Sequence, residues 1–276
     1  MTIYIKNNMK VLKPIKDILS FEGKTVLITG SAGGIGEAIA KRFAEAGANL
    51  QLLDIDLDKL KESVNNYKDT IVSKISTFKI DLSKKEEIDA FWEELGEENT
   101  PDILINNAGI YPNKDYLEVD EKYLDKTLDI NMNSMFWMCQ NFIRSRIKKG
   151  GAIVNLSSIE AILPFKKDLV HYTVSKAGVI ALTRSLARDY GRQGFRANVI
   201  LPGAIKTPGT NFLIKEALTK AKFGLMKTGY DFKQRLANGR WGIPDEIAKV
   251  VLFLSSDMAS YVQGAVLPVD GGFLTS

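Results

Sequence analysis

The chain has 276 residues, of which 45% are hydrophobic and 25% charged, so it can bury a sizeable core and should fold as an ordinary globular protein. Its 37 basic and 33 acidic residues are scattered and leave a net charge of +4, without the basic blocks of proteins that bind nucleic acid or membrane surfaces. We therefore expect neither kind of partner. Cys139 is the only cysteine, so the chain cannot form an intramolecular disulfide, which fits a reducing, cytoplasmic setting. It lies in an apolar run, which fits a buried side chain.

The N-terminal residues carry lysines at positions 6, 10, 13 and 16, which interrupt any apolar stretch. A signal peptide needs a continuous apolar core and a membrane span needs about 20 apolar residues, so we expect neither in this chain. We interpret residues 1–22 as an N-terminal extension, either a short surface helix or a loose arm without chemistry of its own.

From Lys24 onward, short apolar runs alternate with longer segments of helical spacing, the pattern of βαβ units around a parallel sheet. Most runs are uniformly apolar, as expected for parallel strands that helices cover on both faces. The expected strands are 24–30, 49–55, 73–81, 102–109, 151–158, 196–203 and 264–272. The expected helices are 35–46, 56–67, 84–96, 121–149, 172–191 and 244–256. We predict a single doubly wound, three-layer α/β/α domain over residues 23–276, with a seven-stranded parallel sheet.

Residues 205–243 break this rhythm, because they hold two or three short helical pieces where one crossover would suffice. The insertion follows the carboxyl end of a strand, where open α/β sheets bind ligands, so we expect a lid over the substrate. Its basic residues either attract an anionic substrate or belong to solvated helix faces, and they are Lys206, Lys215, Lys220, Lys222, Lys227, Lys233, Arg235 and Arg240.

The first expected strand runs into the sequence TGSAGGIGEAIA at 29–40, so a strand, a glycine-rich turn and a helix start follow one another. Gly30, Gly34 and Gly36 would let the backbone turn tightly, approach a pyrophosphate and pack the helix against the sheet. Free N–H groups at the helix N-terminus would face the negative charge. An ordinary tight turn between a strand and a helix would explain the same glycines.

Thr29, Gly30, Gly34 and Gly36 have the spacing TGxxxGxG, with Ile35 between the last two glycines, and this resembles the glycine motif of the short-chain dehydrogenase/reductase family. Further motifs resemble that family's in the expected order: Asp81-Leu82, NNAG at 106–109, LPGAIKT at 201–207, GRWGIPDEIA at 239–248 and VDGG at 269–272. The resemblance spans roughly residues 23–273 and implies a Rossmann-like oxidoreductase that binds a nicotinamide cofactor.

The second expected strand ends at Asp54, where a carboxylate can accept hydrogen bonds from both hydroxyls of an adenosine ribose and would repel a 2′-phosphate. Phosphate-preferring relatives usually carry a basic residue in the turn or just after this strand, where the chain has Ser31, Ala32 and Ile55, so we favour NAD over NADP. Asp56 is expected to cap the next helix. The cofactor-binding residues that the resemblance implies are Thr29, Gly30, Ser31, Gly34, Ile35, Gly36, Asp54, Asp81, Leu82, Asn107, Ala108, Gly109, Tyr172, Lys176, Pro202, Gly203, Ile205 and Thr207.

Tyr172 and Lys176 are four residues apart and should project from the same face of a helix. A free phenol with a pKa of about 10 is a poor base at neutral pH, and we expect the ammonium and the positive charge of oxidised nicotinamide to lower that pKa. In the family this tyrosine moves the proton and the lysine also binds the nicotinamide ribose. His171, the only histidine, should point in another direction, so we do not expect it to carry the proton.

The resemblance selects two further catalytic residues. Ser158 would hold the substrate oxygen as charge develops on it, with Ser157 in a supporting role. Ser158 stands fourteen residues before Tyr172 where thirteen is frequent in the family, so the loop 159–171 should be one residue longer. Asn131, in preference to Asn133, would hold a water that links the lysine to solvent. We expect no metal, because side chains at metal-ligand spacing are lacking.

The expected substrate cleft is formed by Ile159–Val170, Ile110–Asp115 and the insertion. We expect a secondary alcohol such as a sugar, polyol or steroid. The alternative is a 3-oxoacyl-[acyl-carrier-protein] reductase, but the two basic docking residues of those relatives fall on Lys149 and Gln193, and their usual NADP is disfavoured by Asp54. A catalytically silent nucleotide-binding regulator would not need Ser158, Tyr172 and Lys176. The resemblance also implies a homotetramer or homodimer that pairs helices near 115–149 and 172–191, with a second contact near the C-terminal strand.

Overall fold

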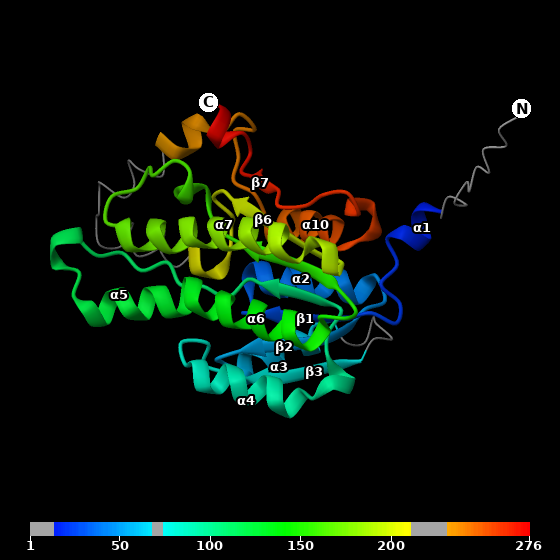
Figure 1. Ribbon diagram of the computed structural model, residues 1–276. Coiled ribbons are helices and arrows are strands. Elements are labelled where there is room, and N and C mark those ends of the chain that lie inside the picture. Colours follow the sequence, from blue (N-terminus) through cyan, green and yellow to red (C-terminus); the bar gives the residue numbers. More distant parts are fainter. Residues whose placement is uncertain (1–13, 68–73, 211–230) are drawn as a thin grey trace, which may run out of the picture.

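The computed structural model describes residues 14–67, 74–210 and 231–276. Residues 1–13 of the expected N-terminal extension lie outside the described residues. Residues 211–230 of the expected insertion also lie outside the described residues (Figure 1). This segment contains Lys215, Lys220, Lys222 and Lys227.

Seven parallel strands form one sheet in the order β3-β2-β1-β4-β5-β6-β7 (Figure 1). They lie on the runs that the sequence indicates, which confirms the predicted doubly wound α/β fold. The strands are β1 (Thr25–Thr29), β2 (Asn49–Asp54), β3 (Ile75–Lys79), β4 (Ile103–Asn106), β5 (Gly151–Leu156), β6 (Phe195–Pro202) and β7 (Val266–Val269). The strand order reverses between the neighbours β1 and β4, so a ligand crevice is expected beyond the carboxyl ends of these two strands.

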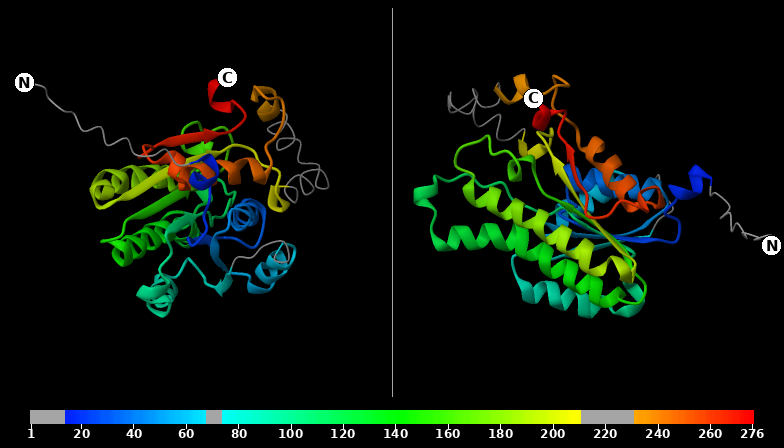
Figure 2. Two further views of the ribbon diagram at one scale, coloured as in Figure 1. Left: turned by 90° about the vertical axis from the view of Figure 1, so that its right-hand side faces the viewer. Right: turned by 45° about the horizontal axis from the view of Figure 1, so that its top comes forward.

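Helices cover both faces of the sheet (Figures 1 and 2). One face carries α2 (Gly34–Glu45), α3 (Leu57–Asn65) and α10 (Pro244–Ser255), and the other carries α4 (Lys85–Leu95), α6 (Ser134–Arg146) and α7 (Val170–Tyr190). Phe43, Leu60 and Val251 are fully buried on the first face, and Ile88 and Phe142 on the second. Within the described ranges, no helix combines the length and the apolar run that crossing a bilayer requires.

The end of the expected N-terminal extension packs against the domain. After the single turn α1 (Ile15–Ile18), the side chain of Phe21 is 3% exposed. Its ring meets that of Phe43 edge to face, with 5.0 Å between the ring centroids, and its N–H donates to the carbonyl of Ala46. The packed part of the chain therefore begins before residue 23.

The long helix expected at 121–149 is not continuous α-helix. It consists of α5 (Glu121–Leu128), a π-helical turn at Asp129–Asn133 and α6. A π turn places an extra residue within one helical turn and is frequent at functional sites. This one carries Asn131, whose side chain is fully buried.

Helix α6 contains the apolar run around Cys139. Its buried residues include Met135, Met138, Cys139 and Phe142, and burial raises the pKa of the Cys139 thiol to about 12. Cys139 is therefore a packed side chain, as expected from its surroundings in the sequence. Phe136 points the other way and is 45% exposed, so one face of α6 is core and the other is open.

Candidate active site

The glycine turn joins the end of β1 to the start of α2. Gly30 and Gly34 have φ values of +64° and +58°, the left-handed region that glycine adopts readily. A Cβ on Gly36 would lie 2.1 Å from the carbonyl oxygen of Gly30, and one on Gly30 would lie 2.8 Å from Cα of Ala108. No side chain caps α2 at Gly33, so the first N–H groups of the helix are available to an anion.

The NNAG segment after β4 is tied to this turn. The hydroxyl oxygen of Thr29 accepts hydrogen bonds from the backbone N–H groups of Asn107 and Ala108, both at 3.0 Å. The side-chain amide of Asn107 donates in return to the carbonyl oxygens of Thr29 and Gly30, at 3.0 and 2.8 Å. These bonds hold the two segments together at the carboxyl ends of β1 and β4.

Asp54 ends β2 beside the turn. Its two carboxylate oxygens accept the backbone N–H groups of Ala32, at 2.9 Å, and of Asp56, at 3.1 Å. Asp56 itself caps α3 by accepting the N–H of Lys59 at 3.0 Å, as expected. The Lys59 side chain reaches over the turn, since a Cβ on Gly33 would lie 3.5 Å from its ammonium nitrogen. A carboxylate and an ammonium therefore both stand at this end of the turn.

Three predicted cofactor residues have side chains engaged in the fold. Ser31 is fully buried and donates to the carbonyl oxygens of Leu53 and Ile28, at 3.1 and 3.3 Å. Leu82 is 9% exposed and packs in the core under α4, and Ile35 packs against the core on the opposite face. Such residues can meet a ligand through their backbone groups, while their side chains set the shape of the turn.

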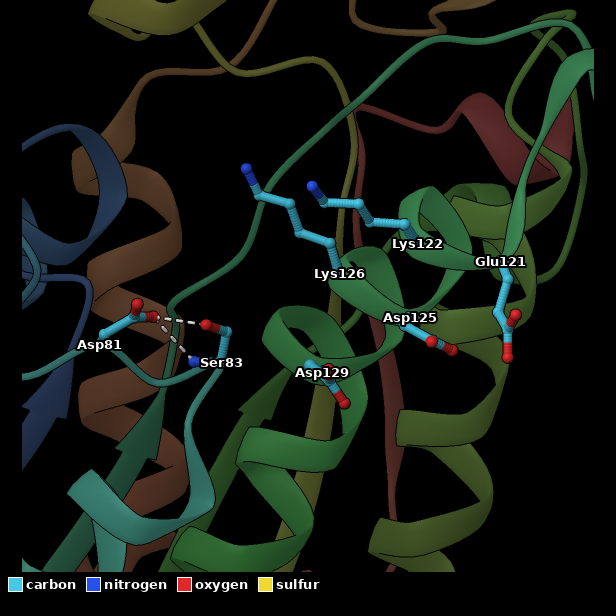
Figure 3. Close-up of a pocket in the computed structure, with 7 residues that line it drawn as sticks. All are labelled: Asp81, Ser83, Glu121, Lys122, Asp125, Lys126 and Asp129. Atoms are coloured by element: carbon cyan, nitrogen blue, oxygen red, sulfur yellow. Dashed lines mark hydrogen bonds between the residues drawn. The ribbon is translucent and has the colours of Figure 1, made fainter.

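Asp81, just after β3, lies in a different environment. Its carboxylate accepts the backbone N–H and the hydroxyl of Ser83, at 3.0 and 2.7 Å, and these bonds hold its pKa below the usual value. It lines an open cleft of about 540 Å³ in which two lysines extend from α5 (Figure 3). The lining residues are Asp81, Ser83, Glu121, Lys122, Asp125, Lys126 and Asp129. None of the four predicted catalytic residues lines this cleft.

The end of β6 and the segment after it contain the predicted residues Pro202, Gly203, Ile205 and Thr207, and this segment folds back on the glycine turn. A Cβ on Gly203 would lie 2.8 Å from Cα of Asp270, so the segment passes close to the chain after β7. A Cβ on Gly34 would meet the methyl group of Thr207 at 3.4 Å. Thr207 therefore stands directly opposite the turn, and Ile205 is buried beneath it at 5% exposure.

Three of the predicted catalytic residues meet where β5 ends and α7 begins. Tyr172 and Lys176 are 8% and 4% exposed, and the ammonium nitrogen lies 6.0 Å from the centroid of the phenol ring. The ammonium donates to the carbonyl oxygen of Leu156 at 3.0 Å. The hydroxyl of Ser158 lies close enough to the phenol of Tyr172 to favour its ionised form.

Asn131 lies on the other side of Lys176. Its side-chain oxygen accepts the N–H of Ile110 at 2.8 Å, and its nitrogen donates to the carbonyl of Ile110 at 3.0 Å and to the hydroxyl of Ser175 at 3.3 Å. A Cβ on Gly109 would lie 3.2 Å from both the Asn131 oxygen and the Lys176 nitrogen. Glycine at this position therefore lets the NNAG segment pass between the two side chains.

The pKa values of the two ionisable groups differ from the sequence-based expectation. Burial raises the pKa of Tyr172 to about 12, although the nearby hydroxyl of Ser158 acts in the opposite direction. Burial also lowers the pKa of Lys176 to about 8. We expected the ammonium and the positive charge of oxidised nicotinamide together to lower the pKa of the phenol. The protein groups alone do not lower it, because removal from water disfavours both charged forms and the ammonium is directed to Leu156.

Two residues near this site lie in the expected cleft segments Ile159–Val170 and Ile110–Asp115, but the sequence did not single them out. Glu160 is 1% exposed, and burial raises its pKa to about 7. Tyr111 packs edge to face on the ring of Tyr172, with 4.8 Å between centroids. The signal for Glu160 was available as a lone carboxylate in the apolar sequence IEAILPF. Tyr111 had none, because an aromatic residue after a strand is common in any fold.

His171 faces away from these groups. One ring nitrogen lies 3.0 Å from the carbonyl oxygen of Pro112, and the ring packs edge to face on Tyr123 with 5.1 Å between centroids. The position of His171 agrees with the interpretation that it is a neighbour of Tyr172 and not its substitute. Across residues 14–67, 74–210 and 231–276, no three or more His, Cys, Asp or Glu side chains are grouped so that they could hold a metal ion.

Comparisons with known proteins cover nearly the whole chain. A family model described as enoyl-(acyl carrier protein) reductase matches residues 30–274. The 3-oxoacyl-[acyl-carrier-protein] reductase FabG of Chlamydia muridarum is 36% identical over 251 residues, which are 90% of this chain and 96% of that protein. The 2-dehydro-3-deoxy-D-gluconate 5-dehydrogenase of Bacillus subtilis is 34% identical over 267 residues, which are 95% of this chain and 98% of that protein.

The fold is similar to solved structures of the same kind of enzyme. The L-sorbose reductase of Gluconobacter frateurii, solved in complex with NADPH and L-sorbose, matches with a TM-score of 0.86 and 31% identity over 94% of this chain and 99% of that one. The similar proteins act on different substrates, so they share the scaffold and the type of reaction and not one substrate.

Proposed function

Because this chain belongs to the short-chain dehydrogenase/reductase family of NAD(P)-dependent oxidoreductases acting on CH–OH groups, we propose that it oxidises a secondary alcohol or reduces its carbonyl, with Tyr172 as the acid/base. The observation that carries the proposal is the meeting of Ser158, Tyr172 and Lys176 beside the glycine turn. A nucleotide-binding regulator without catalysis would have no need of a buried tyrosine and lysine held in this way.

The residues around the turn fit a dinucleotide. Gly30 and Gly36 have no room for a side chain, the start of α2 offers uncapped N–H groups, and Thr207 stands opposite Gly34. When bound, the nicotinamide cofactor accepts or supplies the hydride. In our proposal Lys176 binds the nicotinamide ribose, and Asn131 holds a water that connects Lys176 to solvent.

The proton is moved by the chain's own side chains. The Ser158 hydroxyl donates a hydrogen bond to the substrate oxygen as negative charge develops on it. In oxidation the phenolate of Tyr172 takes the hydroxyl proton while the carbinol carbon loses its hydride, and in reduction both transfers reverse. Burial opposes the phenolate, so the positive charges of Lys176 and of the oxidised cofactor have to stabilise it together.

We propose NAD as the preferred cofactor. The Asp54 carboxylate is oriented by the N–H groups of Ala32 and Asp56, and each oxygen keeps a lone pair for a ribose hydroxyl. A 2′-phosphate would meet this negative charge. The NADPH bound by the Gluconobacter frateurii enzyme and the ammonium of Lys59 above the turn both favour some use of NADP as well.

A sugar or polyol is the substrate class that we favour, with a steroid as another bulky secondary alcohol. Two of the similar proteins act on sugars or sugar acids by name, the Bacillus subtilis dehydrogenase and the Gluconobacter frateurii reductase. The site adds a 38% exposed tyrosine, Tyr111, to the neighbourhood of Tyr172, and its hydroxyl suits a substrate with several polar groups.

Reduction of a 3-oxoacyl group on an acyl carrier protein is the second candidate, favoured by the identity to the Chlamydia muridarum enzyme. The expected docking positions Lys149 and Gln193 are exposed and lie where β5 and β6 begin, next to the contact between Gly150 and Gly194. Tyr172 is at the opposite end of α7, and 18 residues of helix rise by roughly 27 Å. Docking there would need a long flexible arm to reach Tyr172.

The proposed function is tested with a panel of sugars, polyols, steroids and 3-oxoacyl thioesters, assayed with NAD(H) and NADP(H) in parallel. We expect turnover of one alcohol class, and a loss of about 1,000-fold in kcat/KM for Tyr172→Phe. Tyr190→Phe, at the far end of the same helix, is the matched control and should retain activity. Wild-type turnover by Tyr172→Phe would contradict the mechanism.

We also propose that the protein is cytoplasmic and assembles as a homotetramer or homodimer through α6 and α7. Phe136 and Val174 support this assembly, because they are 45% and 54% exposed on these helices. We also propose a division into an N-terminal extension at 1–22, whose last residues around Phe21 pack on the domain, and a domain at 23–276 with a lid at 205–243.

A further inference from the structure

Glu160 is a buried carboxyl group beside the proposed catalytic pair. It lies in the 3₁₀ turn Ile159–Ala161, and its own N–H donates to the hydroxyl oxygen of Ser158 at 3.2 Å. Its side chain is 1% exposed, which is rare for glutamate unless the group has a partner or a task. The reaction derived above makes no use of it.

The carboxyl group holds the loop that follows. One oxygen accepts the N–H of Phe165 at 3.2 Å, and the backbone of Lys166 also favours the ionised carboxylate, while the other oxygen, equally buried, has no hydrogen-bond partner within the described residues. A buried oxygen without a partner is costly, so this carboxyl group carries a stability penalty.

The loop that Glu160 holds is fixed at two further points. The ring of Phe165 packs on those of Phe232 and Phe273, with centroid distances of 4.9 and 5.1 Å. The carbonyl of Asp168, a non-glycine residue at φ +65°, accepts the N–H of Lys114 from the segment after β4. Glu160 is therefore the anchor nearest to Ser158 in a loop that joins the catalytic residues to the C-terminal aromatic side chains.

The charge of Glu160 reaches the catalytic phenol. The groups that face it are Tyr172, Tyr111 and Lys166, and the Lys166 ammonium lies 4.8 Å from the centroid of the Tyr111 ring. A negative Glu160 raises the pKa of Tyr172, while Lys166 favours the ionised form of Glu160. Ionisation of Glu160 thus opposes formation of the phenolate that oxidation requires.

We propose that Glu160 is a positioning residue of the dehydrogenase site: its carboxyl group fastens residues 161–168 over Ser158 and Tyr172, and its negative charge sets how readily Tyr172 gives up its proton. The inference rests on the proposed function. It adds a residue that acts on the reaction through Tyr172 and the loop, without touching the reacting atoms.

Two variants separate the anchor from the charge. Glu160→Gln keeps an oxygen that can accept the N–H of Phe165 but carries no charge, and Glu160→Ala removes both. The exposed Glu97→Gln is the matched control, because Glu97 precedes β4 whereas Glu160 follows the carboxyl end of β5. For each protein, kcat and KM are measured against pH with a substrate that the wild type oxidises, and the melting temperature shows that the variant is folded.

For Glu160→Gln we expect the pH profile of kcat/KM for oxidation to move to lower pH, because the phenolate no longer faces a negative charge, with KM within about twofold of wild type. For Glu160→Ala we expect the same pH shift and a KM raised about tenfold, because the loop has lost its anchor. A merely structural role would lower the melting temperature in both variants without moving the pH profile.

A pH profile of Glu160→Gln that superimposes on the wild type would overturn the role of the charge, and a wild-type KM in Glu160→Ala would overturn the anchor. If Glu160→Ala does not fold, the pH profile of Glu160→Gln still decides the proposal. Failure of the wild type to turn over any alcohol would count against the proposed function, which is a separate outcome from these two.

Discussion

The two halves of the site are held in different ways. Around the glycine turn, hydrogen bonds from backbone groups hold the segments together. The Thr29 hydroxyl accepts the N–H groups of Asn107 and Ala108, and the Asp54 carboxylate accepts that of Ala32. Around Tyr172, buried ionisable side chains set the geometry, and each has a pKa displaced by burial. The turn therefore depends on the absence of side chains, and the catalytic half depends on the ionisation of those that are present.

The strongest test of the backbone half is Gly36→Ala. A Cβ there would lie 2.1 Å from the carbonyl oxygen of Gly30, a contact that only a shift of the backbone can relieve. We expect NADH, measured by fluorescence titration, to bind at least about 100-fold more weakly, or roughly 3 kcal/mol. Gly33→Ala in the same turn is the control, since its Cβ would meet only the flexible end of Lys59. An equal loss of NADH affinity in Gly36→Ala and Gly33→Ala would contradict the claim that binding depends on the close backbone contact at Gly36.

The buried Glu160 of the catalytic half should make the stability of the protein depend on pH. The pKa of Glu160 is about 7 in the folded protein against an ordinary value of 4.5. The folded state therefore keeps a proton that the unfolded state loses, so stability is highest below about pH 4.5 and falls as the pH rises to about 7, by up to roughly 3 kcal/mol.

Urea unfolding of wild type and Glu160→Gln from about pH 5 to pH 8 measures this contribution. We expect the difference in the free energy of unfolding between the two proteins to change with pH over that window. The variant should gain stability relative to the wild type toward pH 8. A constant difference would show that Glu160 titrates normally and would remove the main distinction between the two halves.

A smaller effect is expected at the adenosine end of the turn, where Asp54 and Lys59 carry opposite charges. Asp54→Ala should weaken NADH binding about tenfold, because the ribose hydroxyls lose an acceptor, and should strengthen NADPH binding, because the 2′-phosphate no longer meets a negative charge. Lys59→Ala should weaken NADPH binding a few-fold and leave NADH unchanged. Titration of both cofactors on both variants checks this, and an unchanged ratio of affinities in Asp54→Ala would refute the preference for NAD.

The smallest expected effect concerns the open face of α6. Phe136→Glu places a charge where we propose that subunits meet, and it should shift the assembly toward smaller species in size-exclusion chromatography with light scattering while the melting temperature changes little. A wild-type mass near that of one chain would contradict the proposed tetramer or dimer.

The fold was largely predictable because apolar runs and glycines are local signals. The strands and helices lie close to their expected bounds, and the turn residues Gly30, Gly34 and Gly36 are placed as their spacing indicates. The interruption of the helix at 121–149 was not predicted, because the π turn at Asp129–Asn133 follows from the pairing of Asn131 with the distant Ile110.

The pKa values of the catalytic half were less predictable, because they too depend on contacts between residues that are distant in the sequence. The positions of Ser158, Tyr172 and Lys176 follow from motif spacing, but the pKa values of Tyr172 and Lys176 depend on how completely the fold removes these two side chains from water. Ser31 illustrates the same limit at the turn, because its polar side chain bonds Leu53 and Ile28 inside the protein. For Glu160 the sequence offered a lone carboxylate in an apolar run, and the burial of its side chain shows why that carboxylate matters.

The central claim is direct hydride transfer from the substrate carbon, with Tyr172 taking only the hydroxyl proton. It is tested most directly by oxidising a substrate deuterated at its carbinol carbon in ordinary water, and the unlabelled substrate in heavy water, and then analysing the reduced nicotinamide by mass spectrometry. We predict deuterium in the reduced cofactor from the labelled substrate and none from the solvent. Deuterium gained from heavy water, or lost from the labelled carbon to water, would contradict the account.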